Sequence, residues 1–356
     1  MARRMGFTFR PLKRANGCAV PEHFPMKLPI ASERKLISRI QKGLPSRDDG
    51  FLRLGIGDDA AVLRVRPGRE LVLTCDLSLE GRHFLRAAHS ADAIGWKSLA
   101  RATSDLAAMG AKPRCFLLSL ALPRGLTGKW LDDFLGGMAR AAFSFDLVAA
   151  GGDTTEHETI LVNITVVGEV EAGRALTRAG AQPGNLICVS GRLGEAQLGL
   201  EVIRQKLHKK ARRKALLQKH LYPEPRLALG QWLAGKRLAT AMIDTSDGLS
   251  TDLAHLCDAS GVGARLFTEK IPTVVVPIKL AFSGIHALEL ALHGGEDYEL
   301  LFTVPANIAK RLPRNHRAVP LTIIGEITRQ KPIVLTDSGG ASRPLMPRGW
   351  DPLRMK

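Results

Sequence analysis

Short apolar runs that suit β-strands alternate with longer amphipathic segments that suit α-helices along most of this chain. The strand-like runs of the first half are rich in Leu, Val and Ile and cover residues 70–75, 115–121, 147–150 and 160–167. The helix-like segments around them cover residues 32–41, 91–109 and 128–142, and Gly110 follows the second of these as a capping residue. This alternation predicts an α/β protein.

One turn-rich stretch, residues 178–185 (RAGAQPGN), interrupts the pattern and marks the best domain boundary. A second series follows it, with strand-like runs at 186–190, 239–244 and 298–304 and helix-like segments at 195–207 and 249–259, the last followed by Gly261. A chain of 356 residues can supply cores for two such domains. We therefore expect an N-terminal domain over residues 31–180, a C-terminal α/β domain over residues 181–356, and a basic leader over residues 1–30.

The lengths of the apolar runs and the spacing of the cysteines indicate in which compartment the protein works. No apolar run in the sequence approaches the length of roughly 20 residues that a helix needs to cross a bilayer. The five cysteines contain no CxxC pair that would suggest zinc binding or redox chemistry. Free thiols suit a reducing cytosol, so we expect a cytoplasmic protein without membrane contact.

The net charge is +17, from 51 basic and 34 acidic residues. The basic residues concentrate in the first 14 positions and in residues 204–219, without the interleaved aromatic side chains that stack on bases. A basic tail and a solvated helix face explain them, so a nucleic-acid partner is not favoured. The leader lacks the apolar core of a secretory signal, and Met26 is an alternative start of translation that would leave the leader untranslated.

Four short segments place carboxylates and hydroxyls beside glycines or at strand ends. They are residues 55–59 (GIGDD), 74–76 (TCD), 151–155 (GGDTT) and 244–249 (DTSDGL), and we expect each to be a turn. A single Asp of this kind usually serves a turn or a helix N-cap, but so many in a positively charged chain indicate a bound cation. Hard oxygen ligands suit Mg²⁺, and the glycines let a phosphate approach the backbone.

Two further features sharpen this expectation. Asp105 is a carboxylate within an otherwise apolar stretch of helix, where an unpaired charge is costly to bury. In the last acidic segment the strand ends at Asp244, Ser246 can cap the next helix, and Asp247 falls in its first turn, so that the helix N-terminus could receive a phosphate. The sequence has neither a P-loop nor a dinucleotide-binding glycine motif, so a nucleotide must be held in another way.

These motifs, in this order, resemble the thiamine-monophosphate kinase family from about residue 32 to residue 350. The matching segments are GIGDDAAVL (55–63), GRHF (81–84), SDLAAMGAKP (104–113), GGDTT (151–155), GRALTRAGAQPG (173–184), SGRLGEAQLGL (190–200), IDTSDGL (243–249) and GGEDYELLFTV (294–304). That family is similar to aminoimidazole ribonucleotide synthetase, selenophosphate synthetase and a hydrogenase-maturation protein. The resemblance implies two α/β domains and a homodimer formed through the N-terminal sheets.

The same resemblance implies ATP-dependent phosphorylation of thiamine monophosphate to thiamine diphosphate, with several Mg²⁺ ions. The implied metal ligands are Asp59, Thr74, Asp76, Asp105, Asp153, Asp244 and Asp247, and the implied ATP contacts are Gly152, Asp153, Arg178 and Ser246. His83, Glu296 and Trp350 would contact the thiamine monophosphate. Cys75 departs from the hydroxyl residue that the family commonly has there. A thiol is a poor Mg²⁺ ligand, so Cys75 is left out of the expected site.

Phosphoryl transfer needs placement and neutralisation of charge more than covalent help, and bound Mg²⁺ supplies both. The acceptor is a phosphate monoester whose second pKa is about 6, so it is largely ionised at neutral pH. We therefore expect no residue that acts as a proton-transfer catalyst.

Other interpretations of these residues remain open. Without the motifs, His83, Glu296 and Trp350 would be read as an ordinary histidine, a polar turn and a packing tryptophan. The alternative enzyme is another ATP-dependent member of the superfamily, although only Cys18 offers a reactive thiol near the N-terminus and the chain ends in Lys356, not in cysteine. The alternative of another class is a nucleic-acid-binding protein on the same scaffold, whose phosphate partner the acidic segments would repel unless metal fills them.

Overall fold

The computed structural model describes residues 32–47, 50–207, 214–282 and 284–353. The expected basic leader, with Met26 and Cys18, lies outside the described residues. The first described helix, α1 (Glu33–Gly43), begins after Ser32, whose side-chain oxygen accepts a hydrogen bond from the Lys35 N–H. Within these ranges, no helix is both long and apolar enough to cross a membrane.

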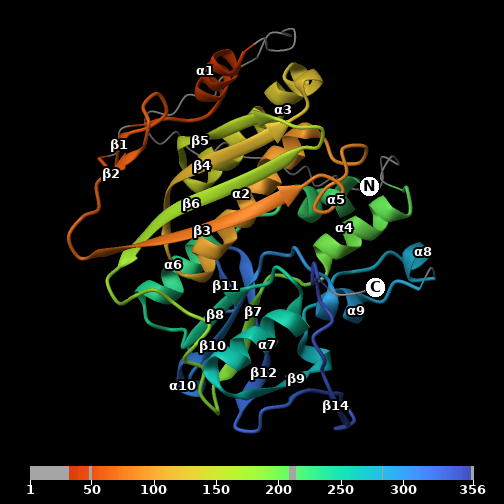
Figure 1. Cartoon of the computed structure of the whole chain (residues 1–356). Coiled ribbons are helices and arrows are strands. Elements are labelled where there is room, and N and C mark those ends of the chain that lie inside the picture. Colours follow the sequence, from red (N-terminus) through yellow and green to blue (C-terminus); the bar gives the residue numbers. More distant parts are fainter. Residues whose placement is uncertain (1–31, 48–49, 208–213, 283, 354–356) are drawn as a thin grey trace, which may run out of the picture.

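A four-stranded sheet forms the N-terminal unit, in the order β3-β6-β4-β5. Its strands are β3 (Arg69–Leu79), β4 (Lys112–Leu122), β5 (Val148–Glu156) and β6 (Leu161–Glu171). Strands β4 and β5 are parallel, and the other neighbours are antiparallel. Helices α2 (Ala91–Ala108) and α3 (Lys129–Phe145) lie together behind this sheet in the upper part of Figure 1.

Glycines let α2 and α3 cross at close range. A Cβ atom on Gly95 would lie 2.0 Å from the Phe134 carbonyl oxygen, and one on Gly137 would lie 1.9 Å from the Asp92 carbonyl oxygen. No larger residue fits at either position. Leu99 and Phe134 are fully buried in the core of this unit, so α2 is held firmly in place.

A larger sheet forms the C-terminal unit, in the order β14-β13-β9-β12-β7-β10-β8, with β11 paired to β12. Its strands are β7 (Leu186–Ser190), β8 (Ala241–Asp244), β9 (Gly263–Phe267), β10 (Leu300–Val304), β11 (Asn315–His316), β12 (Val319–Thr328), β13 (Ile333–Thr336) and β14 (Ser342–Pro344). Strands β9 and β13 are parallel, and the other neighbours are antiparallel.

The remaining elements are short or connect the two units. They are β1 (Leu52–Leu54), β2 (Val62–Leu63), α4 (Glu195–Arg204), α5 (Lys214–Leu221), α6 (Leu227–Gly235), α7 (Leu249–Ser260), α8 (Ile278–Ala281), α9 (Ala287–His293), α10 (Ala306–Ala309) and the 3₁₀ turns η1 (Arg124–Leu126) and η3 (Thr268–Lys270). Helix α7 packs on the C-terminal sheet through its own side chains Leu253 and Leu256, which are fully buried.

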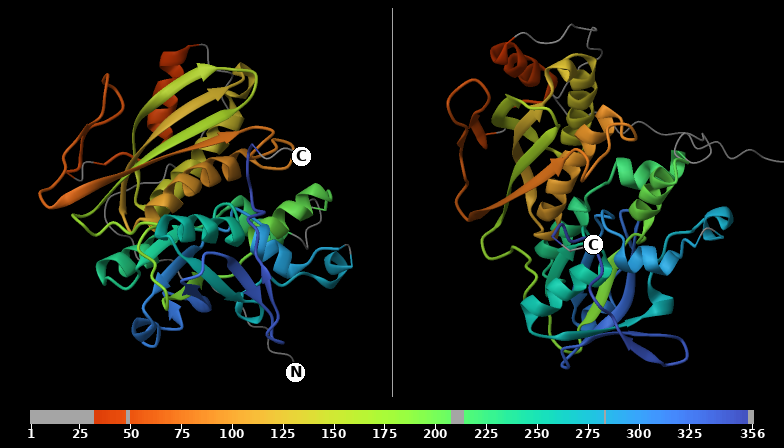
Figure 2. Two further views of the ribbon diagram at one scale, coloured as in Figure 1. Left: turned by 60° about the horizontal axis from the view of Figure 1, so that its bottom comes forward. Right: turned by 45° about the vertical axis from the view of Figure 1, so that its right-hand side comes forward.

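The segment from α5 to α6 joins the units by packing against α2. Trp96 of α2 donates a hydrogen bond to the Pro223 carbonyl oxygen at 2.8 Å, and Tyr222 donates one to Asp92 at 2.8 Å. A Cβ atom on Gly230 would lie 2.0 Å from the Ala107 carbonyl oxygen, so α6 touches the end of α2. Figure 2 shows the two units stacked with these helices between them.

The expected α/β character is confirmed, and the predicted helices at 91–109, 128–142 and 249–259 are present as α2, α3 and α7. The predicted helix at 195–207 ends earlier, at Arg204. The strands between residues 262 and 344, apart from β10, had no counterpart in the sequence analysis, because most of them are short and the long one, β12, is only partly buried over much of its length.

Three local predictions were wrong. Residues 74–76 and 151–155 are not turns, because β3 pairs with β6 as far as Leu79 and β5 pairs with β4 as far as Glu156. Ser246 does not cap α7: the helix begins at Leu249, and its N-cap is Gly248, with φ 112°. The Asp252 carboxylate instead accepts the Gly248 N–H at 2.9 Å, a bond that no short-range cap preference predicted.

Candidate functional site

A cavity of about 760 Å³ lies between the two units. Its lining comes from β3 and the loop after it, from α2, from the turn after β8, from the loop before β10, from the C-terminal segment and from helices α4, α5 and α9. The sequence-predicted residues that line it are Asp76, His83, Asp105, Asp244, Ser246, Asp247, Glu296 and Trp350. Segments far apart in the chain therefore meet at one place.

Asp105, Asp244 and Asp247 form the acidic end of this cavity. Ser104 donates a hydrogen bond to Asp244 at 2.5 Å, and Thr74 donates one to Asp105. Burial raises the pKa of Asp244 well above its usual range, and repulsion from Asp105 adds to this rise. Burial likewise raises the pKa of Asp105 and of Asp247. Carboxylates buried together without enough positive charge favour a bound cation.

These carboxylates do not converge on one point. In the part of the chain that the structure describes, no three His, Cys, Asp or Glu side chains lie close enough together to hold a metal ion. The chemistry of the set nevertheless fits Mg²⁺, which takes a few carboxylates and leaves its other positions to water and phosphate oxygens.

Glu296 forms the other end of the cavity and has two partners already in place, one cation and one imidazole. Lys97 of α2 donates to its Oε2 at 2.8 Å, and His220 Nδ1 lies 3.3 Å from the same oxygen. Burial alone would raise the pKa of Glu296, but Lys97 and His220 hold it well below its usual range. Glu296 has φ 68° and Tyr298 has φ 50°, a left-handed backbone that is strained for such residues and is found most often at functional sites.

Two histidines extend this end of the cavity inward. The Nε2 atoms of His89 and His220 are 3.0 Å apart, and both side chains line the cavity. Burial and the charge of Lys97 lower the pKa of His89 to about 3 and also lower that of His220. Both rings are therefore neutral at pH 7. If the Leu85 N–H donates to His89 Nδ1 and His89 donates to His220, the His220 Nδ1 proton faces Glu296.

His83 and Trp350 approach each other across the cavity, with ring centroids 6.3 Å apart. The Leu79 N–H donates to His83 Nδ1 at 3.0 Å, and burial lowers the pKa of His83. The Trp350 N–H donates to the Asp247 carbonyl oxygen at 2.8 Å, which fixes the C-terminal segment against the start of α7. Trp350 lines the cavity and is 44% exposed.

Asp76 has an unexpected partner. Arg101 of α2 binds it through two hydrogen bonds, from Nη2 to Oδ1 at 2.9 Å and from Nε to Oδ2 at 3.1 Å. Neither Arg101 nor Lys97 was predicted for the site. Both are charged residues in a mostly apolar stretch of α2. The same feature pointed to Asp105, because a charge is costly to bury, and it applies equally to these two cations.

The structure does not bring the remaining predicted residues into the cavity. Asp59 is exposed in the turn after β1, and Gly152 and Asp153 are exposed on β5. The sheet order puts β5 at the edge opposite β3, about 14 Å away for three strand spacings. Arg178 is exposed on the connection between the units, where its charge opposes the rise in pKa that burial causes at Asp244.

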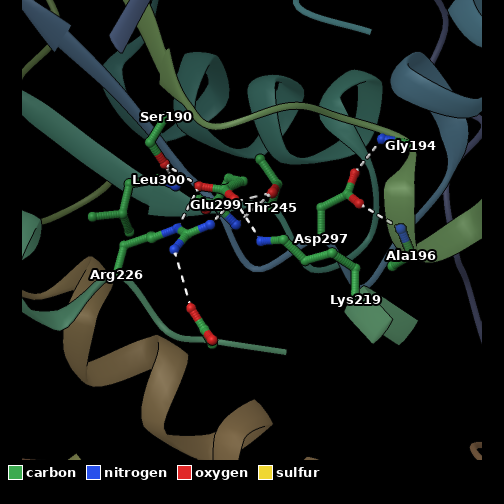
Figure 3. A network of polar contacts seen from close by, with 10 residues as sticks. Ser190, Gly194, Ala196, Lys219, Arg226, Thr245, Asp297, Glu299 and Leu300 are labelled. Atoms are coloured by element: carbon green, nitrogen blue, oxygen red, sulfur yellow. Dashed lines mark hydrogen bonds and ion pairs between the residues drawn. The ribbon is translucent and has the colours of Figure 1, made fainter. Parts of the chain in front are cut away.

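A second network that sequence reasoning missed anchors the loop that carries Glu296 (Figure 3). Glu299, which is fully buried, accepts hydrogen bonds from Ser190 at 2.6 Å, Arg226 at 2.7 Å and Lys219 at 2.9 Å. Asp297 accepts the N–H groups of Gly194 and Ala196 at the start of α4, at 2.5 and 2.9 Å. The strained residue Glu296 is thus fixed from its C-terminal side. Three acidic residues directly before a buried strand were the available signal.

Comparison with known proteins gives the relationship of the chain. Residues 57–170 match the family model described as AIR synthase related protein, N-terminal domain, and residues 182–338 match the corresponding C-terminal domain. The thiamine-monophosphate kinase of Escherichia coli strain K12 is 39% identical over 287 residues, which covers 78% of this chain and 85% of that protein. That of Aquifex aeolicus is 33% identical over 327 residues, covering 91% and 99%.

Solved structures agree with the sequence matches. A thiamine-monophosphate kinase from Stenotrophomonas maltophilia K279a has a TM-score of 0.74 and 36% identity, covering 85% of this chain and 96% of that one. AaThiL complexed with AMPPCP and TMP has a TM-score of 0.70 and 33% identity, covering 92% and 99%. A hydrogenase maturation protein, HypE, has a TM-score of 0.70 at 19% identity, covers 89% and 98%, and shares the fold alone. Sequence and structure together show that this chain belongs to the thiamine-monophosphate kinase family.

Proposed function

We propose that this protein transfers the γ-phosphoryl group of ATP to thiamine monophosphate and so forms thiamine diphosphate. One observation carries the proposal: a single cavity joins an acidic end, which calls for cations, to an end where Glu296, His83 and Trp350 can hold an organic acceptor. The names of the relatives and the complex of AaThiL with AMPPCP and TMP support it.

Mg²⁺ is the ion that we propose for the acidic end. Asp105, Asp244 and Asp247 would each supply a ligand to one of several such ions, with Asp76 beside them, Thr74 orienting Asp105, and water and phosphate oxygens filling the other positions. When bound, Mg²⁺ supplies neutralisation and in-line placement of phosphate oxygens. The raised pKa values of these carboxylates support the assignment, because a cation between them would offset the repulsion that raises them.

The chain's own residues then bind and orient. Ser246, which lines the cavity, and Arg178, which lies outside its lining, are proposed nucleotide contacts, whereas the ionised Glu296 and the neutral His83 are proposed to face the acceptor. No residue is given a proton to move, because a phosphate monoester is already largely ionised at neutral pH. Asp59, Gly152 and Asp153 remain predictions, since they do not line the cavity in a single chain.

We also propose a homodimer formed through the uncovered face of the N-terminal sheet. Along β3, Val72, Thr74 and Asp76 are partly buried, whereas the alternate residues Leu71, Leu73 and Leu77 are 37%, 62% and 44% exposed. An exposed apolar row of this kind on a sheet marks an interaction surface. Sedimentation should give a dimer for the wild type, and Leu73→Glu should give monomers at micromolar concentration. A wild type that is monomeric and fully active would overturn this assembly.

The domain division and the compartment are proposals of the same kind. The proposed boundary near residue 180 is supported by the two separate sheets and by the two family models, of which one ends at residue 170 and the other begins at residue 182. The described cysteines, Cys75, Cys115, Cys188 and Cys257, are free thiols, which suits a reducing cytoplasm.

The function is tested by an ATP-consumption assay with thiamine monophosphate and with free thiamine as acceptors, coupled to identification of the product. We expect Mg²⁺-dependent formation of thiamine diphosphate from thiamine monophosphate alone. Turnover of free thiamine in its place, or ATP hydrolysis that does not depend on any acceptor, would refute the proposed reaction.

A further inference from the structure

Arg101 occupies the middle of the cavity, between its two ends. Lys97, Arg101 and Asp105 are four residues apart on α2, so their side chains follow one another along one face of the helix, with about 6 Å between neighbouring Cβ atoms. Lys97 contacts Glu296 at the acceptor end, whereas Asp105 belongs to the acidic end. The guanidinium of Arg101 therefore stands where the two ends meet.

The charge of Arg101 acts on both ends at once. It helps to hold down the pKa of Glu296 and, after burial, is the largest cause of the lowered pKa of His83. It also opposes the rise that burial causes in the pKa of Asp105. These effects agree with the position of Arg101 between Lys97 and Asp105 on one face of α2.

Arg101 is only partly occupied by its protein partners. Its side chain is 13% exposed, donates two bonds to Asp76 and donates one long bond to Ser78 at 3.4 Å. A guanidinium has five N–H groups, so one N–H on each terminal nitrogen has no acceptor among the described residues. Lys97, in contrast, is 4% exposed and committed to Glu296.

We propose that Arg101 binds the phosphate group of the acceptor and so makes the enzyme select a phosphorylated substrate over the free alcohol. This inference rests on the proposed function. In the ligand-free enzyme Asp76 holds the guanidinium ready, and a phosphate monoester entering from the acceptor end meets the unused N–H groups. A planar guanidinium matches phosphate oxygens in geometry and charge better than an ammonium group does.

The competing explanation is that Arg101 only neutralises Asp76. The two explanations differ in what they predict for a ligand that lacks the phosphate. If Arg101 only neutralises Asp76, its loss should weaken the binding of thiamine and of thiamine monophosphate equally, or should weaken the binding of the nucleotide at the acidic end. If Arg101 binds the phosphate group, its loss should weaken the binding of thiamine monophosphate alone.

The experiment measures the dissociation constants of thiamine monophosphate and of thiamine by calorimetry, in the presence of Mg²⁺ and AMPPCP so that no turnover occurs. It compares the wild type with Arg101→Met and Arg101→Lys. The matched control is Arg140→Met, which removes an arginine bonded to a carboxylate at 2.9 Å outside the cavity. Thermal melting verifies that each variant is folded.

We expect Arg101→Met to weaken the binding of thiamine monophosphate by about tenfold or more, as for the loss of a charge-assisted hydrogen bond. The affinity for thiamine should stay within about twofold, AMPPCP should bind no more weakly, and Arg101→Lys should recover part of the loss. Arg140→Met should leave the ratio of the two affinities as in the wild type.

The proposal would be overturned if Arg101→Met weakened the binding of both ligands equally, so that the ratio of their dissociation constants stayed as in the wild type. If Arg101→Met does not fold, Arg101→Lys carries the same test: an affinity ratio equal to that of the wild type would overturn the proposal. A failure of the proposed function is visible separately, because the wild type itself would then neither bind nor phosphorylate thiamine monophosphate.

Discussion

Asp244 and Glu296 line the same cavity, and their environments shift their pKa values in opposite directions. Asp244 is 3% exposed, is hydrogen-bonded by Ser104 and has its pKa raised by burial and by Asp105. Glu296 is half-buried, with its side chain 24% exposed, and Lys97 and His220 hold its pKa well below the usual range. Glu296 has a cation bonded directly to it, whereas no cation among the described residues is bonded to the carboxylates of Asp105, Asp244 or Asp247.

This difference indicates how the site is divided. A carboxylate that is neutralised by its own protein can orient a ligand without a metal. A group of acidic residues whose charge is not neutralised depends on a cation that arrives with the nucleotide. If this comparison is correct, substitutions at the two ends should have different consequences for stability, metal dependence and acceptor affinity.

The largest expected effect is on stability at the neutralised end. Lys97→Met removes the main partner of Glu296 and should lower the free energy of unfolding by about 3–5 kcal/mol, because it leaves a charge buried without its partner. Urea denaturation measures this loss. The double variant Lys97→Met with Glu296→Gln should recover much of it, and Lys129→Met, at an exposed pair, should leave the midpoint nearly unchanged. Equal midpoints for Lys97→Met and Lys129→Met would contradict the comparison.

At the acidic end the expected loss is in turnover. Asp105→Asn should lower kcat by about 100-fold or more, because a ligand that helps to neutralise phosphate charge is lost. The fold should stay intact, and the melting temperature should stay the same or rise, because burial and repulsion from Asp76 disfavour the charge of Asp105. The control is Asp133→Asn on the surface of α3. Near-normal turnover in a folded Asp105→Asn protein would remove the metal assignment.

Substitutions of the acceptor residues should impair the use of thiamine monophosphate and leave nucleotide binding unchanged. His83→Ala and Glu296→Gln should each raise the KM for thiamine monophosphate by about tenfold or lower kcat, because each removes a contact worth about 1–2 kcal/mol. Binding of AMPPCP with Mg²⁺, measured by calorimetry, should remain close to that of the wild type. Equal damage to nucleotide binding would place these residues in the nucleotide site, and unchanged kinetics would remove the acceptor pocket.

The smallest expected effect is a dependence of stability on pH. His89 has its pKa lowered to about 3 in the folded protein, against 6.5 in a model peptide. Between these values the unfolded chain binds a proton that the folded chain does not, so the wild type loses stability as the pH falls. The loss reaches about 1 kcal/mol one unit below 6.5.

His89→Asn removes this contribution, whereas His220, Lys97 and Glu296, which face the ring, remain. The difference in unfolding free energy between the wild type and His89→Asn should therefore shrink as the pH is lowered from 7 to 5.5. Above pH 7.5 the difference should not vary with pH. A constant difference across the whole range would show that His89 is not held neutral by the fold.

The sequence alone determined the α/β alternation, the family and the carboxylates that line the cavity, with His83, Ser246 and Trp350. These follow from local information: the periodicity of apolar residues, and short motifs in which Asp, Gly and Ser stand at fixed spacing. Asp105 was identifiable because an acid is costly in an apolar helix. The same reasoning applied to Lys97 and Arg101 would have added two cations to the predicted site.

Only the tertiary structure decided which charges are neutralised. The partners of Glu296 come from α2 and α5, and those of Glu299 come from β7, α5 and the connection to α6. It also decided that GGDTT is a strand, since its hydrogen-bond partners lie on β4. Pairings of this kind join segments tens to hundreds of residues apart, and a pattern of neighbouring residues contains no information on which distant charge will stand opposite.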